Sequence, residues 1–203
     1  MSGLTLIVVA GLVGYLLGSV PSGLLLLRAM GAPDPRTLGS GNIGATNVAR
    51  AGGRAVGLAT LVLDVTKGAL PALLFGALDP RAGAVAGLAA VLGHCHPVWL
   101  RFSGGKGVAT FLGACAALAF PVAPLAFVLT WGMLVAATRL VSVASVAACC
   151  VAAIAALVSG GSMASWPGWA LVMAALLVTM RHRANFARIR RGEEPRMGRG
   201  GQT

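Results

Sequence analysis

Long apolar runs separated by short polar stretches dominate this chain. The apolar segments occupy residues 4–27, 55–78, 82–100, 107–120, 121–138, 140–158 and 164–180. A helix needs about 20 apolar residues to cross the hydrocarbon core of a bilayer. The fourth segment is short enough to be a half-helix. The pattern therefore predicts an all-α, polytopic membrane helix bundle with about seven transmembrane segments, some of them short.

Prolines and charges mark the breaks between these segments. Pro121 separates the fourth from the fifth, and Arg139 separates the fifth from the sixth. The first apolar run has no Lys or Arg before it and exceeds the apolar core of a signal peptide, so we interpret it as a retained span. The longest polar stretch is the tail after Met180. We therefore expect residues 1–203 to form a single integral-membrane domain, with residues 195–203 as a disordered basic tail.

The charge distribution predicts the orientation. The chain is 57% hydrophobic and carries 16 Lys and Arg against 5 Asp and Glu, a net charge of +11. All arginines from Arg181 onward fall on one side of the predicted bundle, and only Arg81 lies in an opposite loop. The positive-inside rule then places the N-terminus outside and the C-terminus in the cytoplasm, and five crossings would give the same result. The basic residues are dispersed and have almost no aromatic neighbours, so we expect no nucleic-acid partner.

Three polar segments fall on the predicted cytoplasmic side. The first polar segment, residues 39–53, places glycines among neutral hydrogen-bonding side chains and an arginine. Glycines allow successive backbone N–H groups to converge on an anion, and a guanidinium adds a fixed positive fork. Its candidate ligand groups are Ser40, Gly41, Asn42, Gly44, Thr46, Asn47 and Arg50. The segment predicts a phosphate-binding loop, although Asn42, Thr46 and Asn47 could equally cap the following helix.

The second polar segment, residues 93–110, contains a Gly-Gly-Lys-Gly core. This core lacks the Ser or Thr that follows the lysine of a nucleotide-binding loop and the glycine five residues before it, so we exclude ATP or GTP binding. Lys106 with Gly104, Gly105 and Gly107 at the start of a helix predicts a site for a phosphate monoester or an acyl phosphate.

The histidines of this segment could suggest a metal. His94, His96 and Cys95 could supply three ligands, but the two histidines are two residues apart and point to different sides of a helix, and no fourth donor is evident. We expect no metal site. The cysteines all sit in apolar stretches and form no C-x-x-C pair, which is typical of inert thiols.

The third polar segment, residues 181–194, continues the last span as a helix. A spacing of three and four places His182, Asn185, Phe186 and Ile189 on one face. We expect Glu193 to stabilise the segment through nearby arginines.

Polar residues also occur inside apolar segments. Asp64 and Lys67, three residues apart, are predicted to pair and so reduce the cost of burial. Ser142 lies at a span entrance, where its hydroxyl could reach a ligand or its own backbone.

Together, these segments resemble the three motifs of the bacterial acyl-phosphate:glycerol-3-phosphate acyltransferase family, which is membrane-integral and PlsY-type. The third shows the order R-H-x-x-N…R…G-x-E, and residues 63–68 and the surroundings of Ser142 are also similar. The resemblance extends from residue 18 to residue 194. It implies a small polytopic fold in the bacterial inner membrane, with its active site on the cytoplasmic side. The implied reaction transfers a fatty acyl group from acyl phosphate to the sn-1 hydroxyl of glycerol-3-phosphate, giving lysophosphatidic acid and phosphate, the first step of phospholipid synthesis.

The chain shows no G-x-S-x-G elbow and no His-x-x-x-x-Asp pattern, so we expect direct attack by the glycerol hydroxyl without an acyl-enzyme. The expected catalytic residues are Ser40, Lys106, His182 and Asn185, and the expected substrate-binding residues are Gly41, Asn42, Gly44, Thr46, Asn47, Arg50, Gly104, Gly105, Gly107 and Ser142. His182 is expected to hydrogen-bond Ser40 and to orient or deprotonate the nucleophile, and the resemblance equally permits a substrate phosphate as the base. The expected partners are glycerol-3-phosphate, acyl phosphate and membrane lipid, with no cofactor and no obligate protein partner.

Two other functions fit parts of the pattern. A secondary transporter for an organic phosphate would also be a helix bundle with glycine-interrupted spans, but transporters usually show inverted repeats and binding groups near the bilayer midplane. A non-catalytic lipid-binding scaffold would not need neutral polar residues in tight glycine loops.

Overall fold

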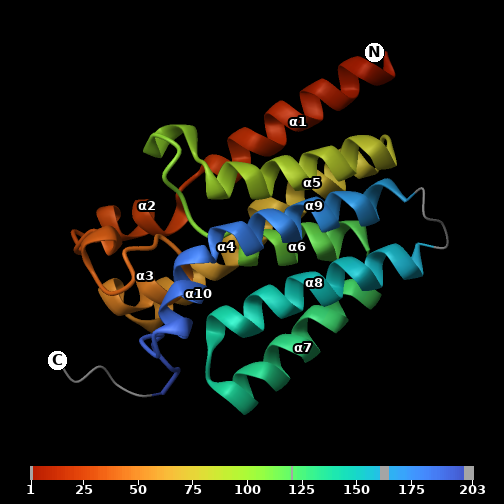
Figure 1. Ribbon diagram of the computed structural model, residues 1–203. Helices are drawn as coiled ribbons and strands as arrows, with labels where there is room; N and C mark the ends of the chain where they lie inside the picture. The colour runs from red at the N-terminus through yellow and green to blue at the C-terminus, as the bar shows by residue number, and fades with distance from the viewer. Residues whose placement is uncertain (1, 120, 161–164, 199–203) are drawn as a thin grey trace.

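The computed structural model describes residues 2–119, 121–160 and 165–198. In this part of the chain every regular element is a helix (Figure 1). The α-helices are α1 (Gly3–Ser19), α2 (Ser22–Ala29), α3 (Ala45–Gly52), α4 (Arg54–Gly76), α5 (Pro80–Cys95), α6 (Val108–Leu118), α7 (Val122–Thr138), α8 (Val141–Ser159), α9 (Trp166–Arg181) and α10 (Arg183–Arg190). Two 3₁₀ turns, η1 (Pro35–Thr37) and η2 (Val98–Leu100), interrupt the connections.

The predicted apolar segments correspond to helices. Four of them, Gly3–Ala29, Arg54–Gly76, Pro80–Leu100 and Val141–Ser159, are long and apolar enough to cross a membrane. Three shorter apolar helices, Val108–Leu118, Val122–Thr138 and Trp166–Arg181, complete the bundle. The all-α class is therefore confirmed, whereas the number of full crossings and the positions of the termini remain predictions.

The first apolar segment is not one continuous helix. It breaks after Ser19, and α2 begins at Ser22. Pro21 explains the break, because it has no N–H to donate and disfavours a helical conformation in the residue before it. Val20 accordingly has extended backbone angles, with ψ 117°. The break lets α2 turn away from the axis of α1 (Figure 1).

Small residues set the packing of the long helices. Helix α1 packs along α5, α4 along α6, and α7 along α8. A Cβ atom added to Gly14 would collide with the carbonyl of Ala86, and one added to Gly113 would collide with the carbonyl of Val65. Such close backbone contact is how helices associate in a membrane, where apolar side chains gain little by leaving lipid.

The outer surface of the bundle is apolar, and the polar segments gather at one end. Large side chains such as Leu12, Leu61, Leu129 and Ile154 are exposed, as expected of a surface that faces lipid tails. Figure 1 shows α2, α3, α10 and the connection from α5 to α6 at the same end of the bundle. The three polar segments therefore share one end, as the sequence predicted.

Candidate functional site

The first polar segment is organised by Asn47, which is 2% exposed. Its Nδ2 donates to the carbonyls of Pro35 (2.6 Å), Leu38 (3.0 Å) and Asn42 (2.9 Å). Its Oδ1 accepts from the backbone N–H of Ser40 at 3.3 Å. The amide group predicted to bind substrate is therefore used to shape the loop around Ser40.

The other candidate groups of this segment divide between a local turn and solvent exposure. The Oδ1 of Asn42 accepts from the N–H of Gly44, the residue before α3, at 2.9 Å, which forms a local turn ahead of the helix and does not cap its first turn. The side chains of Ser40, Thr46 and Arg50 are exposed and available to a ligand. Gly41 has φ 67°, a left-handed conformation that glycine adopts without strain.

The glycines of the second polar segment are held on the end of α5. The N–H groups of Gly104 and Gly105 donate to the carbonyls of Cys95 (3.2 Å) and His94 (3.0 Å). Their own carbonyls accept from Arg181, at 2.9 Å from Nη2 to Gly104 and 3.1 Å from Nε to Gly105. The sequence predicted that the N–H groups of Gly104 and Gly105 would face an anion. In the structure they are already hydrogen-bonded to carbonyl groups at the end of α5.

The donors that remain free in this segment lie slightly later. The N–H groups of Lys106 and Gly107 have no hydrogen-bond partner among the described residues. Gly107 is the N-cap of α6 with φ 85°, and the first turn of that helix adds unpaired N–H groups and the positive end of its dipole. The predicted anion site is thus shifted to Lys106 and the start of α6.

The ammonium group of Lys106 is partly buried among charges. Burial lowers the pKa of Lys106, Glu194 opposes the shift, and Arg188 and Arg181 add to it, so that the pKa is about 8. At pH 7 the group is mostly charged, in a place where its charge is poorly screened by water. Arg181, which the sequence analysis did not select, joins the second and third polar segments.

His182 stands between α9 and α10 and is 2% exposed. Its Nδ1 lies 2.8 Å from the carbonyl oxygen of Val178, which can only accept, so Nδ1 carries the proton. Burial lowers the pKa of His182 to about 4, although the Val178 bond works in the opposite direction. The ring is therefore neutral at pH 7, and its Nε2 presents a lone pair.

The hydrogen bond predicted between His182 and Ser40 is absent from the described residues. The ring satisfies Nδ1 on its own helix, and Ser40 is held at the surface of the first segment. Both residues lie at the same end of the bundle.

Glu194 orders the third polar segment. Its carboxylate accepts from Nδ2 of Asn185 at 2.7 Å and from Nε of Arg188 at 2.8 Å, and its side chain is 8% exposed. Burial alone would raise the pKa of Glu194, but Asn185, Ser142 and Arg188 outweigh it and the pKa is lowered. Glu193, which we expected to play this part, forms an exposed pair with Arg191, and such pairs contribute little to stability.

Two buried polar atoms beside this carboxylate have no hydrogen-bond partner among the described residues. They are Oγ of Ser142 and Oδ1 of Asn185, and each side chain belongs to a residue that is 4% exposed. Ser142 is close enough to favour the ionised form of Glu194 without forming a hydrogen bond to it. Buried polar atoms are rarely left unsatisfied, so these two are candidates to hydrogen-bond a substrate.

The chain beyond Glu194 contacts the connection between α7 and α8. The N–H of Met197 donates to the carbonyl of Arg139 at 2.8 Å, and Nη1 of Arg196 donates to the carbonyl of Thr138 at 3.3 Å. Residues 199–203 of the predicted tail lie outside the described residues.

The structure also shows the polar pair within α4 and the cysteines. Asp64 and Lys67 pair as expected, with Oδ1 and Nζ 2.8 Å apart. The four cysteines are unpaired, and within the described ranges no group of three His, Cys, Asp or Glu side chains is placed to hold a metal ion.

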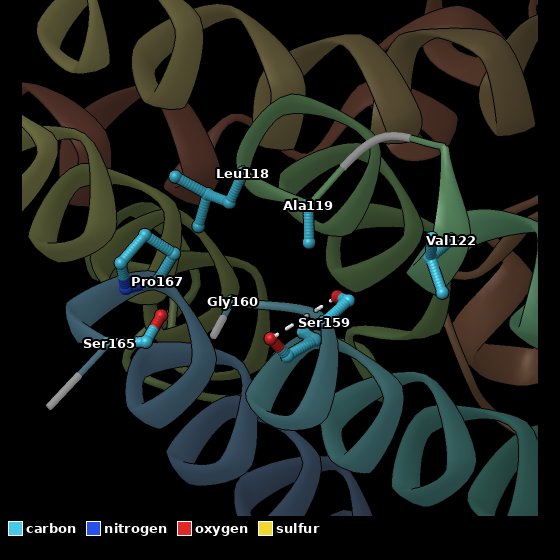
Figure 2. Close-up of a pocket in the computed structure, with 8 residues that line it drawn as sticks. Leu118, Ala119, Val122, Ser159, Gly160, Ser165 and Pro167 are labelled. Carbon is cyan, nitrogen blue, oxygen red and sulfur yellow. Dashed lines mark hydrogen bonds between the residues drawn. The ribbon is translucent and has the colours of Figure 1, made fainter. Parts of the chain in front are cut away.

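A pocket of mixed polar and apolar lining lies at the end of the bundle away from the polar segments. The residues that line it (Figure 2) come from the ends of α6 and α8 and the starts of α7 and α9: Leu118, Ala119, Val122, Ala156, Ser159, Gly160, Ser165 and Pro167. None of the predicted site residues lines it, so the polar end remains the candidate site.

Comparison with known proteins identifies the family of the chain. A family model described as glycerol-3-phosphate acyltransferase matches residues 8–192. A glycerol-3-phosphate acyltransferase of Rhodospirillum rubrum is 50% identical over 201 residues, covering 94% of this chain and 90% of the relative. One of Cereibacter sphaeroides is 47% identical over 200 residues, covering 98% of this chain and 93% of the relative.

Two solved structures share the fold. Both are of PlsY (YgiH), an integral membrane glycerol 3-phosphate acyltransferase, one in its glycerol 3-phosphate form and one in its lysophosphatidic acid form. The first has a TM-score of 0.87 and 38% identity, and covers 98% of this chain and 96% of that one. The second has a TM-score of 0.84 and 35% identity, with 95% of each chain covered.

Proposed function

The chain belongs to the glycerol-3-phosphate acyltransferase family, and from this premise we propose that it transfers a fatty acyl group from acyl phosphate to the sn-1 hydroxyl of glycerol-3-phosphate. The products are lysophosphatidic acid and inorganic phosphate. The observation that carries the proposal is the cluster of charges formed by Lys106 with Arg181, Arg188 and Glu194, together with the unpartnered buried atoms of Ser142 and Asn185 beside the Glu194 carboxylate. This cluster offers cations to phosphate groups and neutral hydrogen-bonding atoms to a hydroxyl.

The names of the two similar structures support the substrate and the product. Their glycerol 3-phosphate and lysophosphatidic acid forms indicate that this fold binds a small phosphate monoester and its acylated product. In our proposal the glycerol-3-phosphate phosphate binds near Lys106 and the start of α6, and the exposed Arg50 assists from the first polar segment.

We propose direct transfer. The sn-1 oxygen attacks the carbonyl carbon of acyl phosphate, and the bond from that carbon to the phosphate oxygen breaks with its electron pair leaving on phosphate. Cations that neutralise two phosphates reduce their repulsion and hold hydroxyl and carbonyl together. Acyl phosphate already carries a good leaving group, so no enzyme nucleophile is required.

His182 is proposed to position the hydroxyl. Because the pKa of His182 is about 4, its Nε2 accepts a hydrogen bond at neutral pH but is a weak final acceptor of the proton. A phosphate oxygen of a substrate then takes the proton. Ser40, exposed at the same end, is proposed to contact the substrate from the first segment.

We further propose that the site faces the cytoplasm at the bacterial inner membrane. The support is the excess of arginine and lysine in the connections at the end that holds the three polar segments. Both substrates would meet there, since acyl phosphate partitions into lipid and glycerol-3-phosphate is water-soluble.

The decisive experiment incubates the purified protein, in detergent or lipid nanodiscs, with palmitoyl phosphate and glycerol-3-phosphate. We expect stoichiometric lysophosphatidate and phosphate, with acylation at sn-1 by NMR. Palmitoyl-CoA serves as the competing donor, and faster transfer from it would overturn the proposed donor. Uptake of labelled glycerol-3-phosphate into vesicles without acylation would instead support a carrier.

The pKa of Lys106 predicts the alkaline limb of the pH profile. Below about pH 8 the ammonium is charged and attracts phosphate, and above it the charge is lost. We expect kcat/KM for glycerol-3-phosphate to fall as the pH rises through 8, approaching about tenfold per unit. In Lys106→Arg the charge persists at alkaline pH, so this limb should disappear even if the overall rate is lower. An unchanged limb in Lys106→Arg would assign it to another group.

A further inference from the structure

Three ionisable side chains are buried inside the bundle on α4 and α5, and none of them belongs to the predicted site residues. Asp64 and Lys67 of α4 and His94 of α5 are 3%, 8% and 4% exposed. Ionisable groups within membrane-spanning helices are costly to bury, and they are retained where they serve a function.

Lys67 connects this group to the break between α1 and α2. Its Nζ donates to the carbonyl of Val20 at 2.9 Å while pairing with Asp64. Val20 precedes the proline at which the chain turns into α2. Helix α2 in turn supports the first polar segment, because the space beside Gly23 is filled by the side chain of Val48 and the carbonyl of Ile43.

His94 connects the same group to the second polar segment. Its Nδ1 lies 3.8 Å from Oδ1 of Asp64 and has no hydrogen-bond partner among the described residues. The other side of the ring packs against Gly105. A Cβ atom added at position 105 would overlap Nε2 of the ring, so only glycine fits there. The carbonyl of His94 also accepts the N–H of Gly105, at 3.0 Å.

We propose that Asp64, Lys67 and His94 act as one buried positioning unit that sets the placement of the first polar segment relative to Lys106. Asp64 is its centre, with Lys67 reaching the α1–α2 break and the His94 ring supporting Gly105. The unit does not touch substrate; it acts through the residues that do. This inference rests on the proposed site, because it assigns the unit an effect on glycerol-3-phosphate binding.

Stability alone does not explain these residues. A buried ion pair can often be replaced by neutral residues of similar volume without loss of stability, whereas removing one partner leaves an uncompensated charge. The variant Lys67→Met should therefore fold poorly. The double variant Asp64→Asn, Lys67→Met carries no unpaired charge and should recover the thermal stability of the wild type.

The test measures the dissociation constant of glycerol-3-phosphate for the whole protein in detergent by calorimetry, with the melting temperature measured in parallel. We expect the double variant to melt near wild type and to bind glycerol-3-phosphate about 10-fold more weakly or worse, because the hydrogen bond from Lys67 to Val20 is lost and the charge of Asp64 beside His94 is removed. The matched control is Asp79→Asn, Arg81→Met, which removes an ion pair at the opposite end of the bundle and should bind normally.

Wild-type binding in the folded double variant would overturn the proposal. Failure of the double variant to fold would also count against it, since the group would then be needed for folding itself.

A second variant pair tests the His94 contact: Gly105→Ala should weaken binding by collision with the ring, and His94→Ala in the same chain should restore part of the loss. No recovery would remove His94 from the unit. Because binding is measured without an acyl donor, these outcomes are independent of whether acyl phosphate is the donor.

Discussion

Replacing Lys106 with alanine is expected to lower kcat/KM for glycerol-3-phosphate on the order of 10²- to 10³-fold, the usual effect of removing one well-placed electrostatic donor from a site. The side chain is partly buried, and its burial lowers its pKa to about 8. A charge in such surroundings interacts more strongly with phosphate than the same charge in water would. Steady-state kinetics with both substrates varied will show which constant changes.

Two variants control this measurement. Lys106→Arg keeps a positive charge but replaces a compact ammonium with a planar fork, so partial activity is expected. Arg101→Ala removes an exposed cation five positions away in the same connection and should leave kcat/KM within about twofold, as is usual for surface substitutions. Equal losses in Lys106→Ala and Arg101→Ala would mean that general positive charge, rather than a placed ammonium, attracts the substrate.

The apolar pattern predicted the helices well because each span must satisfy its backbone internally, whatever its neighbours are. The break at Pro21 was missed because the apolar run continues past it. Proline was the available signal: it removes a donor and restricts Val20, which is why the chain turns there.

The glycines at positions 104 and 105 show why a loop pattern cannot name its own ligands. Glycine indicates that the backbone approaches something closely. In the structure that partner is the end of α5, through Cys95 and His94, together with the guanidinium of Arg181. Which N–H groups stay free depends on contacts between residues about 10 and 80 positions apart, and no local spacing contains that information.

Sequence spacing predicted the ion pair correctly where both residues lie on one helix. It named the wrong glutamate where the chain continues past the end of a helix. Asp64 and Lys67 pair because three residues make nearly one turn. Beyond α10 the chain reverses at Gly192, with φ 72°, so Glu194 rather than Glu193 returns to Asn185 and Arg188. The glycine signals a turn, but the identity of the inward-facing glutamate requires the tertiary structure.

Replacing His182 with asparagine is expected to lower kcat about 10²- to 10⁴-fold, the range for losing a positioned proton-transfer or orienting group, while the protein stays folded. An asparagine Nδ2 can replace Nδ1 as the donor to Val178, but nothing replaces the lone pair of Nε2. The substitution therefore separates the structural bond of the ring from its proposed contact with the hydroxyl.

His182→Ala is the matched comparison, since it loses both groups and leaves the Val178 carbonyl without its partner. We expect the alanine variant to melt below the asparagine variant and both to be similarly slow. The pKa of about 4 adds a second expectation: Nε2 is unprotonated at pH 6 to 8, so His182 should contribute no pH dependence to the wild-type rate there. Asparagine activity near wild type would show that Nε2 does not contact the nucleophile. An acid limb between pH 7 and pH 6 that is present in the wild type and absent from the asparagine variant would show that the ring is more basic than its burial implies, whereas a limb that both share belongs to another group, such as a substrate phosphate.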